Sequence, residues 1–246
     1  MAEWFSSFQN DIYRNFIVED RWQLLVDGWV VSLQVSFMGL VLGVVLGIII
    51  AAMRMTTVNF FGKYLGLKFI DTIINRLIRM VSYIYLDVVR GTPAVTQILI
   101  WHFVVFAGTN VPVIIGASIA IGVNSGAYVA EIIRAGILSV EKGQAEAGRT
   151  LGLSSFTTMR TIVMPQAVKN ILPTLCNEFI ILIKETAIMG FVALTDLNRA
   201  ARQIFSVTFD FWLPLFAAAI MYYLTIKTLT IFLRMLERRL RRADAR

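Results

Sequence analysis

The sequence is poor in charged residues, cysteine and histidine, and each shortage excludes a class of protein. Only 16 % of its 246 residues are charged, whereas a soluble globular domain carries about a quarter. A single cysteine, Cys176, allows no intramolecular disulfide. With one histidine, no His/Cys cluster has the spacing of a metal site. No nucleophile and base are paired in any recognisable pattern, so we expect neither a metal centre nor an enzyme active site in this chain.

A phosphate-binding loop is also absent from the sequence. No glycine-rich segment ends in Lys-Ser or Lys-Thr, the pattern whose backbone cradles nucleotide phosphates. We therefore expect this chain to hold no cofactor and to hydrolyse no nucleotide.

Apolar residues, in contrast, are abundant and occur in long runs. They make up 57 % of the chain, and the mean hydropathy is +0.71. Residues 29–53 form an uncharged run of about 25 residues, more than the ~20 that cross a bilayer as a helix. An apolar core helix of a soluble protein is the alternative, but several such runs share one short chain. The composition predicts an all-α, polytopic membrane protein.

Five membrane spans are predicted, at about 29–53, 92–107, 112–133, 171–194 and 210–233. The first contains Gly39, Gly43 and Gly47, and the third contains small residues at the same spacing of four, which lets helices approach closely in lipid. The second is expected to start with Thr92 as N-cap and Pro93 at the first helical position. It is short unless the preceding helix extends it.

Two segments outside these spans are amphipathic. Residues 1–28 read as a leader on the outer face, and residues 29–246 as one transmembrane domain. Residues 54–90 combine a polar and an apolar stripe. This pattern predicts a helix on the cytoplasmic surface that could enter the bilayer at its far end.

The basic residues give the orientation. With the N-terminus outside and the C-terminus in the cytoplasm, 18 Lys and Arg lie in cytoplasmic segments and 4 in outer segments. This asymmetry follows the positive-inside rule. It also accounts for the net charge of +7 without a nucleic-acid partner, because the basic residues are shared among juxtamembrane segments.

The polar stretch at about 139–170 predicts a helical elbow. Residues 144–151 form a short helix that Gly152 ends in the left-handed conformation, and Ser154 caps the next helix, which runs toward Pro165. Such an elbow suits docking into a groove on a partner. A plain loop between two spans is the structural alternative.

The same stretch resembles the EAA loop of ABC importer permeases. That loop has Glu-Ala-Ala, three residues, Gly, nine residues, Ile, one residue and Leu-Pro. In register with it are Glu146, Ala147, Gly152, Ile162 and Pro165, while Gly148 replaces the alanine at the third position and Met164 replaces the leucine. The resemblance implies a coupling helix seated in a cleft of a separate ATPase subunit, with contacts from Glu146, Ala147, Gly148, Gly152 and Leu153.

Further segments resemble the polar amino acid branch of this family, which includes histidine, arginine and glutamine permeases. They are Arg90-Gly91-Thr92-Pro93 with Gln97, the stretch 127–136, Lys142-Gly143-Gln144, 164–167 and 177–179 with 184–186. The resemblance implies the type I importer (MetI-like) fold in a bacterial inner membrane. It also implies three partners: an ATPase dimer that binds ATP and Mg, a second identical or homologous permease, and an extracytoplasmic amino-acid-binding protein.

Polar residues within spans are the candidates for a substrate path, since ionisable groups there usually face a cavity or each other. Asn124, Tyr128 and Glu131 share one face of the third span, although Glu131 and Arg134 could equally form a structural ion pair. The other candidates are Thr92, Gln97, Lys184, Glu185 and Thr186. A Lys184–Glu185 pair would neutralise both charges, in a gate or in a structural network.

Two other functions are compatible with parts of the sequence. An ion-driven secondary transporter would use Glu131, Lys184 and Glu185 as proton sites, but it predicts two repeated halves, and the chain shows no repeat. A membrane scaffold that docks a partner through the elbow leaves the charges of the fourth span unexplained. The transported amino acid stays open.

Overall fold

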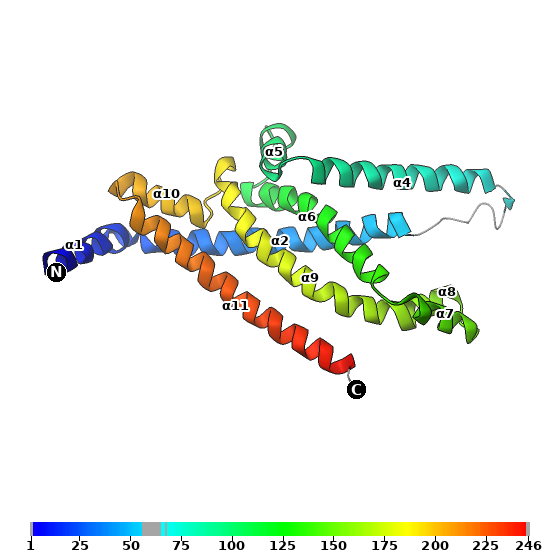
Figure 1. The fold of residues 1–246 in the computed structure, drawn as a ribbon. Helices are drawn as coiled ribbons and strands as arrows, with labels where there is room; N and C mark the ends of the chain where they lie inside the picture. Colours follow the sequence, from blue (N-terminus) through cyan, green and yellow to red (C-terminus); the bar gives the residue numbers. More distant parts are fainter. Residues whose placement is uncertain (1, 56–64, 67, 245–246) are drawn as a thin grey trace.

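The computed structural model describes residues 2–55, 65–66 and 68–244, and all regular structure in these ranges is helical (Figure 1). The longer α-helices are α1 (Ala2–Ile12), α2 (Trp22–Met55), α4 (Lys68–Gly91), α6 (Val113–Leu138), α9 (Met164–Glu185), α10 (Leu197–Thr208) and α11 (Trp212–Asp244). The shorter ones are α5 (Ala94–Ile100), α7 (Lys142–Thr150) and α8 (Ser155–Thr158). Among them lie five short π or 3-10 segments, η1 (Tyr13–Ile17), η2 (Val18–Asp20), η3 (Trp101–Val105), η4 (Met159–Val163) and η5 (Thr186–Val192).

The closest helix packing joins α2 to α6, and glycine makes it possible. A Cβ on Gly47 would lie 2.5 Å from Val129 Cγ1 and 3.0 Å from the backbone N of Ala130. A Cβ on Gly43 would lie 3.0 Å from Ser125 Oγ. The glycine stripe of the first span therefore faces the third, and the predicted close approach is confirmed.

The C-terminal half of α4 packs into the helix bundle. Leu86 and Val89 join a buried cluster with Ile50 of α2 and with alanines of α6. The hydroxyl of Tyr85 donates a hydrogen bond of 2.6 Å to the Val123 carbonyl in α6. This packing favours the option in which the far end of the 54–90 helix enters the bilayer. Part of that predicted segment, 56–64 and 67, lies outside the described residues.

The predicted second span, 92–107, is wrong as an independent span. Its helical part consists of α5 and η3, twelve residues in all, which rise about 18 Å against the ~30 Å of a bilayer core. It is bent by 109° from α4. The chain turns here because Pro93 has no N–H for a helical bond and disfavours helix at the residue before it.

The predicted N-cap of this segment is also wrong. Pro93 occupies the N-cap position of α5, and no side chain caps the helix. The hydroxyl of Thr92 instead donates to the Val88 carbonyl at 2.8 Å. Thr92 therefore closes the end of α4 and does not open α5.

Three helices of the described chain are long and apolar enough to cross a membrane, namely α2, α6 and residues 212–240 of α11. The bent pair of α4 with α5–η3 counts as a fourth if the pair is one span. The predicted fourth span, 171–194, is α-helical only to Glu185, where the 3-10 segment η5 takes over. Lys169, Asn170, Asn177 and Glu178 interrupt the apolar sequence of α9. It nevertheless lies within the bundle against α2, α6 and α11.

The N-terminal leader is attached to the connection between α10 and α11. Buried Asn15 donates a hydrogen bond of 2.7 Å to the carboxylate of Asp210, and the Arg14 guanidinium donates to the Thr208 carbonyl. In Figure 1, α1 and α10 lie at one end of the bundle, and α7 and α8 lie at the opposite end. The leader and the elbow are thus separated by the length of the bundle, as the predicted topology requires, although which end faces the cytoplasm stays a prediction.

Candidate functional site

The elbow between α6 and α9 has the backbone that the sequence predicts. Helix α7 ends where Gly152 adopts a φ of +81°, a left-handed conformation that glycine adopts without a steric penalty. Ser154 then caps α8, because its Oγ accepts a hydrogen bond of 3.2 Å from the Thr157 N–H. Both predictions are confirmed.

Gly148, which departs from the alanine of the EAA pattern, lies at the contact between α7 and the following helix. It is buried, and a Cβ there would lie 2.8 Å from Ile162 Cδ1 and 2.9 Å from Thr158 Cγ2. Its carbonyl also accepts a hydrogen bond of 3.1 Å from the Leu153 N–H. The glycine thus lets α7 lie directly on α8 and η4, so the elbow has a defined shape.

The elbow exposes apolar side chains on its surface. Leu151 is 80 % exposed and Phe156 is 73 % exposed, and Leu153 and Met159 are exposed near them in the sequence. Glu146 and Ala147 of α7 are exposed as well. Large apolar side chains gathered on a surface mark interaction sites. We call Glu146, Ala147, Leu151, Leu153, Phe156 and Met159 the elbow surface.

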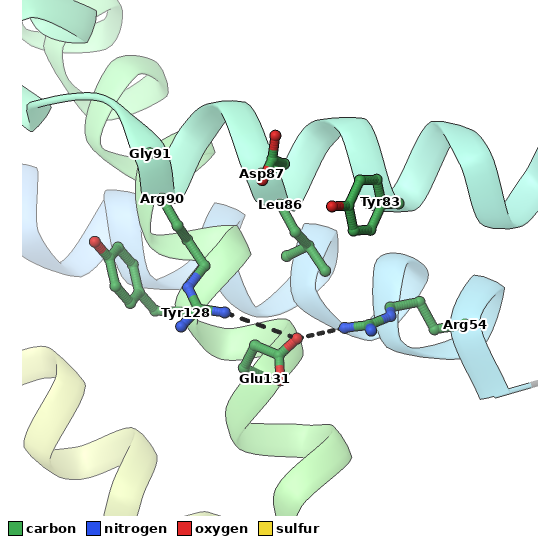
Figure 2. Close-up of a pocket in the computed structure, with 8 residues that line it drawn as sticks. All are labelled: Arg54, Tyr83, Leu86, Asp87, Arg90, Gly91, Tyr128 and Glu131. Atoms are coloured by element: carbon green, nitrogen blue, oxygen red, sulfur yellow. Dashed lines mark hydrogen bonds and ion pairs between the residues drawn. The ribbon is translucent and has the colours of Figure 1, made fainter.

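A second feature is a pocket of about 460 Å³ between α2, α4 and α6 (Figure 2). It is lined by Arg54, Tyr83, Leu86, Asp87, Arg90, Gly91, Tyr128 and Glu131. Pockets of 300–1,000 Å³ with a few convergent polar groups are typical of small-molecule sites. Of the predicted path residues, only Tyr128 and Glu131 line this one.

Glu131 lies at the centre of a cluster of arginines. Its Oε2 is 2.7 Å from Arg134 Nη2 and 2.9 Å from Arg134 Nε, so the predicted pair is confirmed. Its Oε1 accepts a hydrogen bond from Arg54 of α2 and lies 3.9 Å from Arg90 Nη1 of α4 (Figure 2). The carboxylate therefore connects three helices.

The contacts of Glu131 with Arg54 and Arg90 could not be predicted from the sequence. Arg54 precedes Glu131 by 77 residues, and side-chain spacing along one helix is informative only over three or four residues. The only indication of these contacts in the sequence was the position of the two arginines, since Arg54 ends the first apolar run and Arg90 ends the amphipathic helix.

Three other predicted path residues form a hydrogen-bonded group beside this pocket. The Gln97 Nε2 donates to the Val89 carbonyl and to Thr92 Oγ1, both at 2.7 Å. The Gln97 Oε1 accepts a bond of 3.0 Å from Asn124 Nδ2. The bond between Gln97 and Asn124 connects α5 to α6. Asn124 is buried and does not line the pocket that Tyr128 and Glu131 line.

The predicted Lys184–Glu185 ion pair is not present among the described residues. Lys184 is exposed, and its ammonium makes no salt bridge there. Both residues lie in the last turn of α9, where adjacent side chains do not face each other. Thr186 is buried, and its hydroxyl donates to the Ile183 carbonyl at 2.7 Å.

Glu178, only 6 % exposed, is the buried carboxyl of this region. It accepts a hydrogen bond of 2.8 Å from Ser125 Oγ of α6. This bond connects α9 to α6 at the point where Ser125 also lies beside Gly43. The acidic residue within an apolar helix was visible in the sequence, but its serine partner was not.

Comparisons with known proteins identify the family. Residues 43–242 match the family described as "Binding-protein-dependent transport system inner membrane component". The chain belongs to this family. It is thus a membrane permease component, as the EAA-loop resemblance implied.

Relatives match over nearly their whole length. The putative glutamine transport system permease protein GlnP of Rickettsia felis is 34 % identical over 88 % of this chain and 92 % of its own. The arginine transport system permease protein ArtQ of Bacillus subtilis is 33 % identical over 89 % and 94 %. GlnP of Escherichia coli K12 is 33 % identical over 89 % and 93 %.

Solved structures show the same architecture. A chain from a crystal structure described as an amino acid ABC transporter with histidines superposes with a TM-score of 0.78 at 36 % identity, over 91 % of this chain and 98 % of that one. A chain of the MetNI methionine ABC transporter gives a TM-score of 0.64 at 20 % identity, over 87 % and 96 %, a likeness of fold. The predicted all-α, MetI-like fold is confirmed.

Proposed function

We propose that this chain is the permease subunit of an ATP-driven importer for polar amino acids in a bacterial inner membrane. The names of its relatives, which refer to glutamine and arginine transport, support the substrate class. The observation that supports the coupling role is the elbow surface. There the large apolar side chains of Leu151 and Phe156 are exposed, on either side of the turn at Gly152. This surface fits a cleft on a separate ATPase dimer, which would bind ATP and Mg.

Continuous helix connects the elbow to the interior. From Ser155 through η4 to Glu185 the backbone stays helical without a break. Force applied at Phe156 would therefore be transmitted along α9, which contains an internal proline at Pro173, and the Glu178–Ser125 bond would carry the movement to α6. Two such permease chains, identical or homologous, could then alternate between outward-open and inward-open states by rigid-body rotation.

The partners follow from this arrangement. The ATPase dimer would act at the elbow end of the bundle, and an amino-acid-binding protein would deliver the solute at the opposite end, near α1 and α10 (Figure 1). An ion-driven transporter or a docking scaffold has less support, because the matched family is that of binding-protein-dependent systems.

The proposal is tested by reconstituting the chain with its ATPase and binding protein in liposomes. Labelled L-glutamine and L-arginine uptake is measured together with ATP hydrolysis. We expect uptake of at least one amino acid only with ATP on the elbow side. Replacing Glu146 with Lys on the elbow surface should reduce amino acid uptake more than ATP hydrolysis, because the ATPase would then hydrolyse ATP without changing the conformation of the permease.

Co-purification provides the matched control. Leu151→Asp and Phe156→Asp place a charge in the proposed interface and should release the ATPase from the tagged permease. Phe209→Asp changes a side chain that is equally exposed, at 80 %, at the other end of the bundle, and should retain the ATPase. Equal ATPase recovery from all three variants, with uptake intact, would contradict the coupling role.

A further inference from the structure

An apolar furrow runs between α11 and the helices α2 and α9 on the surface of the bundle. It consists of two adjoining cavities of about 480 Å³ and about 520 Å³, and Phe179 of α9 and Leu229 of α11 line both. We call these two cavities together the furrow. Only 6 % of the apolar stretch of α11 is buried, against 67 % in α6. The surface of α11 therefore faces lipid or another molecule over most of its length.

The furrow offers contacts mainly to hydrocarbon, because its few polar groups are already hydrogen-bonded. Trp29 Nε1 of α2 donates a hydrogen bond of 2.9 Å to Thr225 Oγ1. The hydroxyls of Thr225 and Thr228 donate to backbone carbonyls of their own helix, at 2.7 and 2.8 Å. The cavity nearer the C-terminal end of α11 is lined by apolar side chains and Cys176. A molecule that fills the furrow must therefore be apolar where it contacts the helices.

The furrow matches one leaflet of a bilayer in length. Its α11 residues run from Leu224 to Leu236, a rise of about 18 Å, and half of a hydrocarbon core is about 15 Å thick. The furrow ends within the arginine-rich tail, since residues 234–246 contain six arginines and two acidic residues. An acyl chain of the leaflet on that side therefore has the length that the furrow can accommodate.

Two basic residues continue the furrow-lining faces of their helices toward that end. Arg239 follows Leu236 of α11 by three residues, and Leu236 lines the furrow. Lys169 precedes Leu172 of α9 by three residues, and Leu172 lines it too. Residues three apart share one face of a helix. Helices α9 and α11 contact each other, and the start of α9 and the end of α11 both point toward the elbow end of the bundle (Figure 1). Cations from two helices therefore flank this end of the furrow.

We propose that the furrow binds an anionic phospholipid, with an acyl chain between the helices and the headgroup phosphate at Arg239 and Lys169. Arginine presents a fork of N–H donors that matches phosphate oxygens. Basic clusters directly beyond a transmembrane helix, and basic pockets between such helices, attract anionic headgroups. Arg239 is exposed and forms no ion pair with the residues that the structure describes. Its guanidinium is therefore available to a lipid.

Charge favours a lipid over a second permease chain as the occupant of the furrow. The predicted cytoplasmic segments of this chain contain 18 Lys and Arg, so a helix of an identical copy would bring further basic residues to the same end. Like charges would then face Arg239, which disfavours the contact. A phospholipid instead supplies an anion at the membrane boundary and hydrocarbon next to it. This order of groups matches the cations and the furrow.

Photolabelling of the full chain in phosphatidylcholine nanodiscs tests the site. Two probes are compared at equal abundance, phosphatidylglycerol and phosphatidylcholine, each with a diazirine in the same acyl chain. Peptide mass spectrometry locates the adducts. We expect adducts on the furrow-lining peptides of α9 and α11. Labelling there should be at least about fivefold stronger with phosphatidylglycerol, the effect of one basic residue near an anionic headgroup.

Two pairs of variants separate a binding site from general attraction. Arg239→Gln should remove the preference for phosphatidylglycerol. Arg238→Gln makes the same change of charge about 100° around the helix and should retain the preference. Cys176→Phe places a ring in the furrow and should reduce labelling there by both probes. Val41→Phe adds a ring at an exposed position of α2 outside the furrow and should leave the labelling unchanged.

The occupant is identified by a photoreactive residue in the furrow itself. Leu233→benzoylphenylalanine should give an adduct of one chain with one lipid. An adduct with twice the mass of the chain would show a second permease in the furrow and would overturn the inference. Equal labelling by the two probes, or equal loss of preference in Arg239→Gln and Arg238→Gln, would also overturn it. Amino acid uptake is not measured here, so each of these results leaves the proposed function in place.

Discussion

Replacing Gly47 with alanine tests the packing of α2 on α6. The new methyl group would lie 2.5 Å from Val129 Cγ1, 2.7 Å from Val129 Cβ and 3.0 Å from the Ala130 backbone N. Neither a backbone atom nor the Cβ of a fully buried valine can move aside freely. Overpacking of this kind costs about 1–3 kcal/mol, which offsets or exceeds the roughly 1 kcal/mol that alanine gains over glycine in a helix.

The assay is thermal unfolding in detergent, followed by far-ultraviolet circular dichroism. For a chain of this size, each kcal/mol shifts Tm by about 2–4 °C, so a net cost of up to about 2 kcal/mol in Gly47→Ala should lower Tm by up to about 8 °C. Gly143→Ala is the matched control, because its nearest neighbour would be Glu141 Oε1 at 3.8 Å. It should leave Tm unchanged or raise it. A Gly47→Ala chain as stable as this control would refute the close-approach reasoning.

Three further substitutions have expected effects. Ser125→Ala removes the donor to buried Glu178 and should lower stability by about 1–3 kcal/mol; a Tm equal to that of the unaltered chain would show that the bond contributes nothing. Asp196→Ala removes the side chain that caps α10 and should cost about 1 kcal/mol in the same assay, with Asp196→Asn retaining most of the cap. Gly152→Ala forces a residue with a Cβ into a φ of +81°, at about 1–2 kcal/mol, and should speed proteolysis within the elbow; unaltered cleavage would argue against a rigid turn.

The sequence was most informative where local chemistry decides the structure. The left-handed Gly152 and the Ser154 cap depend on residues within one turn of each other, and both are present. The glycine stripe of the first span was equally readable, since only a close helix partner explains small residues at a spacing of four. Its partner, α6, carries the matching small residues.

The sequence was least informative where distant residues or a break in a helix decide the structure. The 92–107 stretch looks like a span by composition, but Pro93 bends it away from α4 and leaves it too short. Lys184 and Glu185 are adjacent in the sequence, yet both lie on α9, where adjacent side chains do not face each other. Glu131 contacts Arg54, which is 77 residues away in the sequence. Hydropathy and residue spacing could not predict this contact.

The most direct measurement for the central claim, that the elbow docks on a separate ATPase, is site-specific cross-linking. Phe156→Cys is introduced after the single native cysteine is removed by Cys176→Ser, and membranes that contain the co-expressed ATPase are treated with a short thiol-to-amine cross-linker. The account predicts a covalent adduct of permease and ATPase, and no labelling of Cys at position 156 when intact cells are exposed to a membrane-impermeant maleimide. Labelling from outside, or an adduct that is absent although the complex transports amino acid, would contradict it.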